Sequence, residues 1–346
     1  MGNVVAAGNG RDFRGPDPAP PVAVAGAGSI GVAWALVFAQ AGHAVSLYDP
    51  AADRRAAVPA ELRSRLVALD DAGLLSEDAA AIAGRVTITG DLDDAVGAAA
   101  YVQECAPESL AVKRELFARL DQGAPPEAVL ASSSSALTAS AITEGLAGAD
   151  RCLIAHPGNP PYLLRVVELV PGPATAPVTV EKAAALLRAA GMAPVRLRKE
   201  IVGFVFNRLQ GAVLREAYAL VRDGIVAPED VDLVMRAGLG RRWSVLGPFE
   251  TVELNTRGGI DRHATIMGPA YARMGAERGH VDAWEPELVS EVSASVGRRL
   301  PREAWEDHVA WRDHALMVLE RCWREHPELA GPPAARSPLP ATESAR

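Results

Sequence analysis

A glycine-rich turn between an apolar run and a helical segment constrains this chain more than any other feature. Residues 22–25 form a short apolar run that leads directly into Gly26-Ala27-Gly28-Ser29-Ile30-Gly31, and a segment of helical character follows. A strand, a glycine turn and a helix in this order are typical of a dinucleotide-binding unit. The pattern predicts a tight turn at Gly26, close approach of the backbone to a pyrophosphate at Gly28, and close packing of helix on strand at Gly31.

An acidic residue follows at the distance that this interpretation requires. Asp49 ends the next predicted strand, residues 44–48. It comes about 20 residues beyond the glycines, where a carboxylate can bind the ribose 2′-hydroxyl of NAD. A carboxylate there would repel the 2′-phosphate of NADP, so NAD is favoured, although Arg54 and Arg55 lie close downstream. The alternative is a glycine-rich turn that binds no nucleotide.

Apolar runs and amphipathic stretches alternate over the first four predicted strands, as an open parallel sheet covered by helices requires. The further predicted strands are residues 86–89, 100–104, 129–131, 153–156, 166–170 and 194–198. From residue 204 to about residue 324, the patterns are helical. We therefore predict four regions: a disordered leader over residues 1–20, an α/β Rossmann-type doubly wound NAD-binding domain over 21–199, an all-α substrate and dimerisation domain over 200–330, and a flexible tail over 331–346.

Charge and cysteine content narrow the classes of partner. The chain has 346 residues and a net charge of -8, which gives no electrostatic reason to expect nucleic acid or an anionic membrane as a partner. No apolar run approaches the roughly 20 residues that a membrane helix needs. Cys105, Cys152 and Cys322 have neither metal-ligand nor disulfide-framework spacing, so we predict no metal site and a reducing, cytoplasmic environment.

Two ionisable side chains stand in apolar runs of one proline-rich segment, residues 151–173. His156 ends a run that begins at Cys152, and Glu168 lies in the middle of residues 166–170. Burying a carboxylate is costly unless it is paired, and a histidine is the partner that would make such a placement chemically useful. The alternative is a core histidine and an unrelated buried salt bridge, and these residues alone do not separate the two.

Polar residues also follow two other predicted strands. Glu108 comes after the strand at residues 100–104, at the edge where open sheets bind ligands. Its alternative role is that of a carboxylate stabilised by a helix N-terminus. Four serines at residues 132–135 follow the strand at 129–131. Their hydroxyl groups either contact a cofactor or substrate oxygen or simply belong to a loop.

Together, the motifs resemble the 3-hydroxyacyl-CoA dehydrogenase superfamily, and within it the branch of L-gulonate 3-dehydrogenase and lambda-crystallin, with carnitine dehydrogenase as a near relative. The resemblance runs from about residue 22 to residue 324. The motifs that carry it are GAGSIG at 26–31, QECAPE at 103–108 with Lys113, SSSS at 132–135, AHPGNPP at 155–161, VELVPGPATAP at 167–177, KEIVGFVFNRLQ at 199–210 and GLGRRWSVLGPFETVELN at 238–255.

The resemblance implies a catalytic role for four residues. His156 would be the general base, Glu168 its paired carboxylate, and Ser135 and Asn207 the contacts of the substrate oxygen. When a hydride leaves the carbinol carbon, the hydroxyl proton must leave too, and a neutral imidazole can accept it. Glu168 would hold His156 in the right tautomer. Ser135 and Asn207 would donate hydrogen bonds to the oxygen as charge develops on it.

The same resemblance implies NAD as the cofactor and assigns its contacts. Ser29 and Ile30 would lie at the pyrophosphate, which sits on the helix N-terminus. Asp49 would bind the adenosine ribose. Glu108 and Lys113 would lie nearer the nicotinamide end.

The substrate implied for this branch is a free L-3-hydroxy acid. Its carboxylate would pair with Arg242 in GLGRRWS, because a guanidinium group binds a carboxylate bidentately, and a structural ion pair is the alternative. Related sequences often carry a larger residue at the position of Gly158. The absence of a side chain here would enlarge the pocket beside His156. Two other hypotheses stay open: a coenzyme A or carrier-protein thioester as substrate, and a purely structural, crystallin-like role. We expect a homodimer formed through the helical domain.

Overall fold

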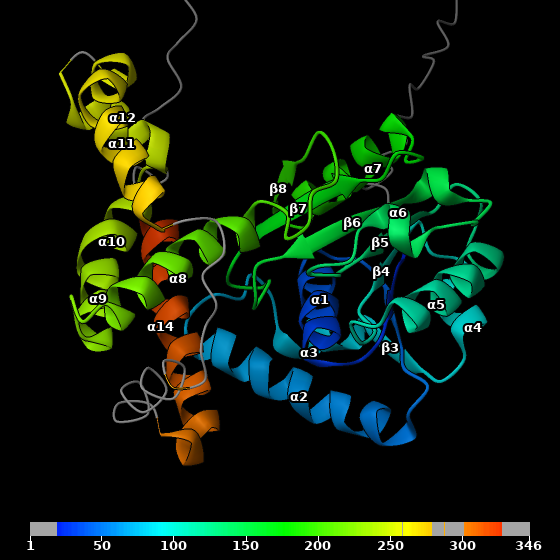
Figure 1. Ribbon diagram of the computed structural model, residues 1–346. Helices are drawn as coiled ribbons and strands as arrows, with labels where there is room; N and C mark the ends of the chain where they lie inside the picture. The colour runs from blue at the N-terminus through cyan, green and yellow to red at the C-terminus, as the bar shows by residue number, and fades with distance from the viewer. Residues whose placement is uncertain (1–18, 258, 279–286, 288–300, 327–346) are drawn as a thin grey trace, which may run out of the picture. The chain divides into compact units, whose positions relative to one another are not determined.

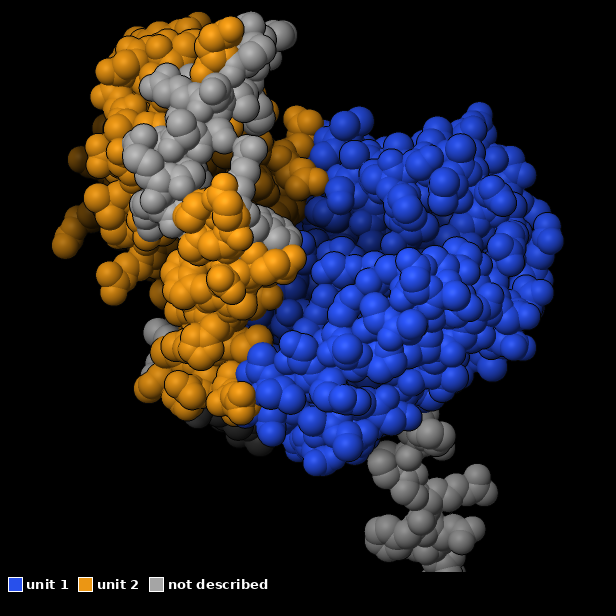
Figure 2. Space-filling model, turned by 90° about the horizontal axis from the view of Figure 1, so that it is seen from below, with its two compact units in different colours: residues 1–70, 75–204 blue, residues 71–74, 205–346 orange. Residues whose placement is uncertain are grey.

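The computed structural model describes residues 19–257, 259–278, 287 and 301–326. The chain divides into two units, residues 1–70 with 75–204 and residues 71–74 with 205–346 (Figures 1 and 2). The predicted leader and tail lie outside the described residues, except for residues 19 and 20.

One eight-stranded sheet forms the centre of the first unit, in the order β3-β2-β1-β4-β5-β6-β7-β8 (Figure 1). Its strands are β1 Val22–Ala25, β2 Val45–Tyr48, β3 Val86–Thr89, β4 Tyr101–Glu104, β5 Val129–Ser132, β6 Cys152–Pro157, β7 Val166–Pro171 and β8 Ala193–Arg196. The strand order reverses between β1 and β4, and ligands bind at such a switch point, outside the carboxyl ends of the strands. The predicted Rossmann-type doubly wound sheet is confirmed.

One strand departs from the parallel arrangement that the alternating pattern suggested. β7 runs antiparallel to β6, and its register places Glu168 directly opposite His156. Parallel neighbours need a crossover of a dozen or more residues, whereas an antiparallel pair can be joined by a short loop. Residues 158–165 are too few for a crossover helix, so β6 and β7 are the one antiparallel pair of the described sheet, which is otherwise parallel.

Seven α-helices pack with this sheet: α1 Ser29–Gln40, α2 Ala52–Asp71, α3 Ala79–Gly84, α4 Leu92–Val96, α5 Leu110–Gly123, α6 Ala139–Ile142 and α7 Pro177–Ala189. The helix after the glycine turn, α1, is the most deeply buried, with residues 32–39 all at most 1% exposed. A helix that is apolar all round belongs inside a domain. The glycine turn is therefore fixed between a buried strand and a buried helix.

The described part of the second unit is helical and contains no strand. Its elements are α8 Phe206–Arg222, α9 Pro228–Val234, the π-helical η2 Met235–Leu239, α10 Gly240–Trp243, α11 Pro248–Asn255, α12 Gly259–Arg278, the 3-10 turn η3 Arg302–Ala304 and α14 Trp305–Glu325. Pro228 at the first position of α9 and acidic residues in its first turn favour a helix start there. Arg278 of α12 pairs with Glu216 of α8 and with Asp223, the residue directly after α8. The predicted all-α character of this part is confirmed.

Candidate active site

The turn between β1 and α1 is shaped by close packing. Gly26 has a φ of +115°, and a Cβ on it would lie 2.7 Å from the carbonyl oxygen of Cys105. A Cβ on Gly31 would lie 1.8 Å from the carbonyl oxygen of Gly26, because α1 starts directly against the turn. Gly28 differs, since no heavy atom of the described residues lies within 4 Å of its Cβ position. The turn is therefore packed on one side and accessible on the other.

A cavity of about 770 Å³ opens where Gly28 is accessible. Its lining includes Gly26, Gly28, Ser29, Ile30 and Asp49, which are five of the predicted cofactor contacts. Ser29 begins α1, and the backbone N–H groups at a helix N-terminus favour an anion such as a pyrophosphate. The volume also lies in the range of about 300–1,000 Å³ that is usual for ligand sites. These residues fit the phosphate and adenosine end of NAD.

Backbone N–H groups hold the Asp49 carboxylate at this cavity. Oδ2 accepts a hydrogen bond from the amide of Ala27 at 2.8 Å, and Oδ1 accepts one from the amide of Ala51 at 2.9 Å. A carboxylate oxygen has two acceptor positions, so each oxygen can still bind a ribose hydroxyl group. Asp49 is thus fixed in place while it keeps acceptor capacity.

The two arginines downstream of Asp49 are engaged within the fold. Arg54 pairs with Glu61 at 2.8 Å and also donates to the carbonyl oxygen of Ala27. Arg55 donates to the carbonyl oxygens of Asp49 and Pro50, at 2.8 and 2.9 Å. Arg54 also lines the cavity, and its buried Nε has no hydrogen-bond partner among the described residues. The preference for NAD over NADP therefore rests on the Asp49 carboxylate, which would repel a 2′-phosphate.

His156 and Glu168 form a buried pair across β6 and β7. The Nδ1 atom of His156 lies 2.9 Å from Oε2 of Glu168, and the two residues are 7% and 3% exposed. The ring of Phe204 lies against the imidazole, with 5.5 Å between the centroids. In the neutral tautomer that donates from Nδ1 to the carboxylate, the lone pair is on Nε2. The residue pattern alone left these two groups as possibly unrelated, whereas the resemblance pairs them, and they lie within hydrogen-bond distance.

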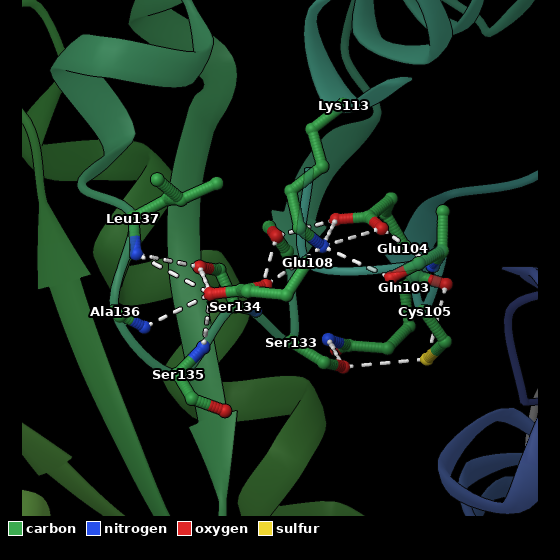
Figure 3. Close-up of polar contacts among 12 residues, drawn as sticks. Gln103, Glu104, Cys105, Glu108, Lys113, Ser133, Ser134, Ser135, Ala136 and Leu137 are labelled. Carbon is green, nitrogen blue, oxygen red and sulfur yellow. Dashed lines mark hydrogen bonds and ion pairs between the residues drawn. The ribbon is translucent and has the colours of Figure 1, made fainter. Parts of the chain in front are cut away.

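The four serines have different surroundings. Each of the first three binds a different polar side chain: Ser132 donates to Glu104, Ser133 accepts from Gln103 at 2.8 Å, and Ser134 donates to Glu108 at 2.6 Å. The Ser135 hydroxyl group points away from Glu108, whereas the Ser135 amide points towards it (Figure 3). The side chain of Ser135 is therefore directed differently from those of the three serines before it.

Glu108 and Lys113, both predicted to contact the nicotinamide end of NAD, are joined inside the fold. Lys113 is 1% exposed, and its Nζ lies 2.8 Å from Oε1 of Glu104 and 3.4 Å from Oε2 of Glu108. Neither Glu108 nor Lys113 is among the described residues that line the 770 Å³ cavity. The Lys113 ammonium group thus has two carboxylate partners within the protein.

The two carboxyl groups beside Lys113 have opposite pKa shifts. Burial raises the pKa of Glu104 above its ordinary value, against the opposing effects of Lys113 and Ser132. At Glu108, partial burial also acts to raise the pKa, but hydrogen bonds from Ser134 and from backbone amides, together with the charge of Lys113, bring it below its ordinary value. Glu108 is therefore the carboxyl group that stays ionised to lower pH.

Sequence reasoning missed three polar residues near the carboxyl ends of the strands and the glycine turn. Glu104 ends a buried strand, and Lys113 follows nine residues later. This spacing alone is too weak a signal to predict an ion pair between them. Gln103 accepts from the hydroxyl group of Tyr101 at 2.7 Å and is 0% exposed. Arg65 of α2 donates to the carbonyl oxygen and to the hydroxyl group of Ser29, at 3.0 and 3.1 Å. Nothing in the pattern of α2 indicated this last contact.

Gly158 does not widen the pocket beside His156 as expected. A Cβ on Gly158 would lie 2.9 Å from the Cβ of Leu164 and 3.1 Å from Cγ1 of Val166. The β6–β7 connection folds back closely, with the amide of Gly158 donating to the carbonyl oxygen of Val166 at 3.0 Å. The space of the missing side chain is therefore occupied by Leu164 and Val166.

The remaining predicted site residues belong to the second unit. Asn207 lies in the first turn of α8 and is half-buried, and Arg242 lies in α10 and is exposed. No helix in the described part of the chain is long and apolar enough to cross a membrane. Within those same residues, no group of three or more His, Cys, Asp or Glu side chains is placed to hold a metal ion.

Comparison of the sequence with known proteins shows which family the chain belongs to. The chain matches the NAD-binding domain model of 3-hydroxyacyl-CoA dehydrogenase over residues 21–201 and the C-terminal domain model over residues 203–292. It is 42% identical over 313 residues to a lambda-crystallin homolog of Bos taurus, covering 89% of this chain and 97% of that protein. It is 35% identical over 303 residues to an L-carnitine dehydrogenase of Streptomyces coelicolor, covering 87% and 88%.

A solved structure shares the fold over most of both chains. It is 5-formyl-3-hydroxy-2-methylpyridine 4-carboxylic acid 5-dehydrogenase, an NAD+-dependent dismutase, with a TM-score of 0.76, 28% sequence identity, and coverage of 88% of this chain and 98% of that one. The family models, the relatives and the glycine turn with its cavity agree on the cofactor and on the class of reaction. The chain is an NAD-dependent oxidoreductase that acts on a hydroxyl group, and it belongs to the 3-hydroxyacyl-CoA dehydrogenase family.

Proposed function

We propose that the protein oxidises the 3-hydroxyl group of an L-3-hydroxy acid, such as L-gulonate, to the 3-keto acid, with His156 as the general base. The observation that carries this proposal is the buried pair of His156 and Glu168, 2.9 Å apart. The residues of the glycine turn would hold NAD, which would supply the acceptor for the hydride of the carbinol carbon. The protein must then remove the hydroxyl proton, and an imidazole is a side chain suited to that task.

The proton would move to Nε2 of His156. Because Nδ1 donates to Glu168 in the neutral form, Nε2 carries the lone pair that receives the proton. The imidazolium ion that forms lies beside a carboxylate that is 3% exposed, where little water screens the attraction. Glu168 would thus hold the ring in position and stabilise its charged form, as the orienting carboxylate does in catalytic triads.

Ser135 and Asn207 would donate hydrogen bonds to the substrate oxygen. Support for Ser135 comes from its orientation, since its hydroxyl group points away from Glu108 while its amide donates to that carboxylate (Figure 3). Donors aimed at an oxygen on which negative charge develops lower the barrier more than donors that bind the ground state. Asn207 is proposed on the motif GFVFNR alone.

The proposed NAD contacts follow the cavity at the glycine turn. Gly26, Gly28, Gly31, Ser29 and Ile30 would surround the pyrophosphate, and Asp49 would bind the adenosine ribose. Glu108 and Lys113 are proposed near the nicotinamide end from the resemblance. We also keep the proposal that residues 21–199 bind NAD and that residues 200–330 complete the substrate site.

A free carboxylate on the substrate is favoured by the relatives. Lambda-crystallin homologs and L-carnitine dehydrogenases match most of the chain, and L-carnitine is itself a 3-hydroxy acid with a free carboxylate. Arg242 is the proposed partner of this carboxylate. The second candidate is a thioester substrate, which the family name, 3-hydroxyacyl-CoA dehydrogenase, supports.

A substrate screen separates these candidates. NADH formation would be measured with L-gulonate, L-3-hydroxybutyrate, L-carnitine and 3-hydroxybutyryl-CoA. We expect turnover with a free acid, and Arg242→Ala should raise its KM about tenfold or more, because a charge-assisted hydrogen bond contributes about 1.5–3 kcal/mol. Arg236→Ala, which removes another exposed arginine of the same helical segment, is the control. Turnover with the thioester alone would contradict the free-acid proposal, and neither turnover nor NAD binding would support a structural role.

We also propose that the second unit forms a homodimer. Its helices leave large apolar side chains exposed, among them Phe249 at 77%, Leu254 at 71% and Leu209 at 61%. Exposed apolar groups on this scale are typical of surfaces that bind another protein. Analytical ultracentrifugation should give twice the mass of the chain, and a monomer at micromolar concentration would contradict the proposal.

A further inference from the structure

We propose that Glu108 is a positioning residue for the reaction: its carboxylate holds the loop of residues 134–137 and thereby directs the Ser135 hydroxyl group (Figure 3). The inference rests on the proposed function, in which Ser135 contacts the substrate oxygen. It gives Glu108 a role that does not depend on touching the cofactor.

One oxygen of Glu108 gathers the donors of this loop. Oε1 accepts from the Ser134 hydroxyl group at 2.6 Å and from the amides of Ser135 and Ala136 at 3.0 Å each, with the amide of Leu137 at 3.4 Å. Residues 133–138 belong to no helix or strand, so these amides have no partners in a regular backbone ladder. Hydrogen bonds to an ionised acceptor are about twice as strong as neutral ones. The Glu108 carboxylate therefore supplies the hydrogen-bond acceptor that a helix or strand would otherwise provide for these amides.

The other oxygen of Glu108 faces a cation that is itself fixed. Oε2 lies 3.4 Å from Nζ of Lys113, and that Nζ also binds both oxygens of Glu104, at 2.8 and 3.0 Å, and the carbonyl oxygen of Ala106 at 3.2 Å. Glu104 and Lys113 are 0% and 1% exposed, so their positions are set by the core. An ammonium group held in this way keeps the Glu108 carboxylate ionised and oriented.

Two serines bind the cluster formed by Glu104, Glu108 and Lys113. Ser132 donates to Glu104 at the end of β5, and Ser134 donates to Glu108 two residues later. The Ser134 hydroxyl group also accepts from the amide of Leu137 at 2.9 Å. Ser135 thus has a backbone fixed by Glu108, while its side chain is exposed and points away from the cluster (Figure 3). This is the geometry expected where the loop presents one hydroxyl group to a ligand.

Ser134→Ala is the sharpest test, because it removes two hydrogen bonds of the loop and leaves Ser135 and Glu108 in place. We expect kcat to fall about 5- to 100-fold, because two hydrogen bonds at about 0.5–1.5 kcal/mol each contribute about 1–3 kcal/mol, and about 1.4 kcal/mol corresponds to a factor of ten. The Kd for NAD should stay within about twofold, and the amides of residues 133–138 should exchange hydrogen faster. Ser76→Ala, at an exposed serine outside this cluster, is the matched control.

Glu108→Gln separates positioning from direct cofactor contact. Positioning predicts a lower kcat at saturating NAD, with an unchanged Kd for NAD and faster exchange of the loop amides. Direct contact alone predicts a higher Kd for NAD, a normal kcat at saturation and unchanged hydrogen exchange of the loop amides. That result would overturn the inference. Glu144→Gln, an exposed carboxylate paired with Arg114, controls for the loss of one charge.

Two readouts keep this inference distinct from the proposed function. Hydrogen exchange and NAD binding need no substrate, so they report on the loop even if the unsubstituted protein oxidises none of the tested acids. In that case the proposed function fails, and exchange decides whether Glu108 holds the loop. If the protein is active, the double variant Ser134→Ala/Ser135→Ala should be no slower than Ser135→Ala, because both changes act through one hydroxyl group. Additive losses in the double variant would overturn the inference.

Discussion

Replacing Glu168 by glutamine tests whether its charge, and not only its shape, serves His156. The carboxylate is 3% exposed and lies 2.9 Å from Nδ1, so it makes a buried, charge-assisted hydrogen bond. Such bonds contribute about 1.5–3 kcal/mol, which corresponds to about 10- to 100-fold in rate at about 1.4 kcal/mol per factor of ten. If the new amide NH2 group faced Nδ1, the ring would adopt the wrong tautomer, and the loss would approach the roughly 10⁴-fold known for the same change in a catalytic triad.

The assay is steady-state NADH formation with the best acid substrate. Glu168→Gln should lower kcat and kcat/KM together, because the interaction strengthens as the imidazolium ion forms. The Kd for NAD should not change, since the cavity at the glycine turn is lined by other residues. Glu181→Gln removes an exposed carboxylate of α7 that pairs with Arg196 of β8, and this variant should behave like the unsubstituted protein. A folded Glu168→Gln variant with kcat within twofold of normal would refute the reasoning.

Three further predictions concern the cofactor site and the buried cluster. Asp49→Asn should raise the Kd for NAD about tenfold, since a charged acceptor is replaced by a neutral one, with kcat unchanged at saturation; calorimetry that shows equal affinity would contradict this. Lys113→Met leaves Glu104 buried without its cation and should lower the free energy of unfolding in urea by about 3–5 kcal/mol, and Glu104→Gln added to it should restore part of the loss. The lowered pKa of Glu108 means that its contribution to stability is present above the unfolded-state pKa of about 4.3 and is lost as the pH falls through the folded-state pKa. Glu108→Gln should therefore flatten the fall of Tm between about pH 5 and pH 3, and an unchanged slope would count against this assignment.

The glycine turn could be predicted because its signals are local. Gly26, Gly28 and Gly31 are read from neighbouring residues and from a strand and helix that adjoin them in the chain. The short apolar runs indicated buried strands for the same reason, since a strand covered on both faces needs no polar alternation. The sheet and NAD as the cofactor follow from these signals, and both are confirmed.

Apart from the resemblance, which implied the pairing of His156 with Glu168, the sequence pattern could not predict the partners of the site residues, because partnership depends on register and on distant segments. Glu168 meets His156 only because β7 runs antiparallel and in one particular register. Lys113 meets Glu104 because a helix packs on a strand, and no periodicity records that contact. For Gly158, reasoning from side-chain size alone gave the wrong expectation, because Leu164 and Val166 occupy the space.

The central claim is that His156 removes the hydroxyl proton, and the most direct measurement is a single turnover with His156→Ala. The variant would be saturated with NAD, mixed with the best acid substrate and followed by NADH formation. The account predicts NAD binding equal to that of the unsubstituted protein and a rate lower by about 10²–10⁴-fold, the usual contribution of a positioned base. NADH formation at a near-normal rate by the folded, NAD-bound variant would contradict it.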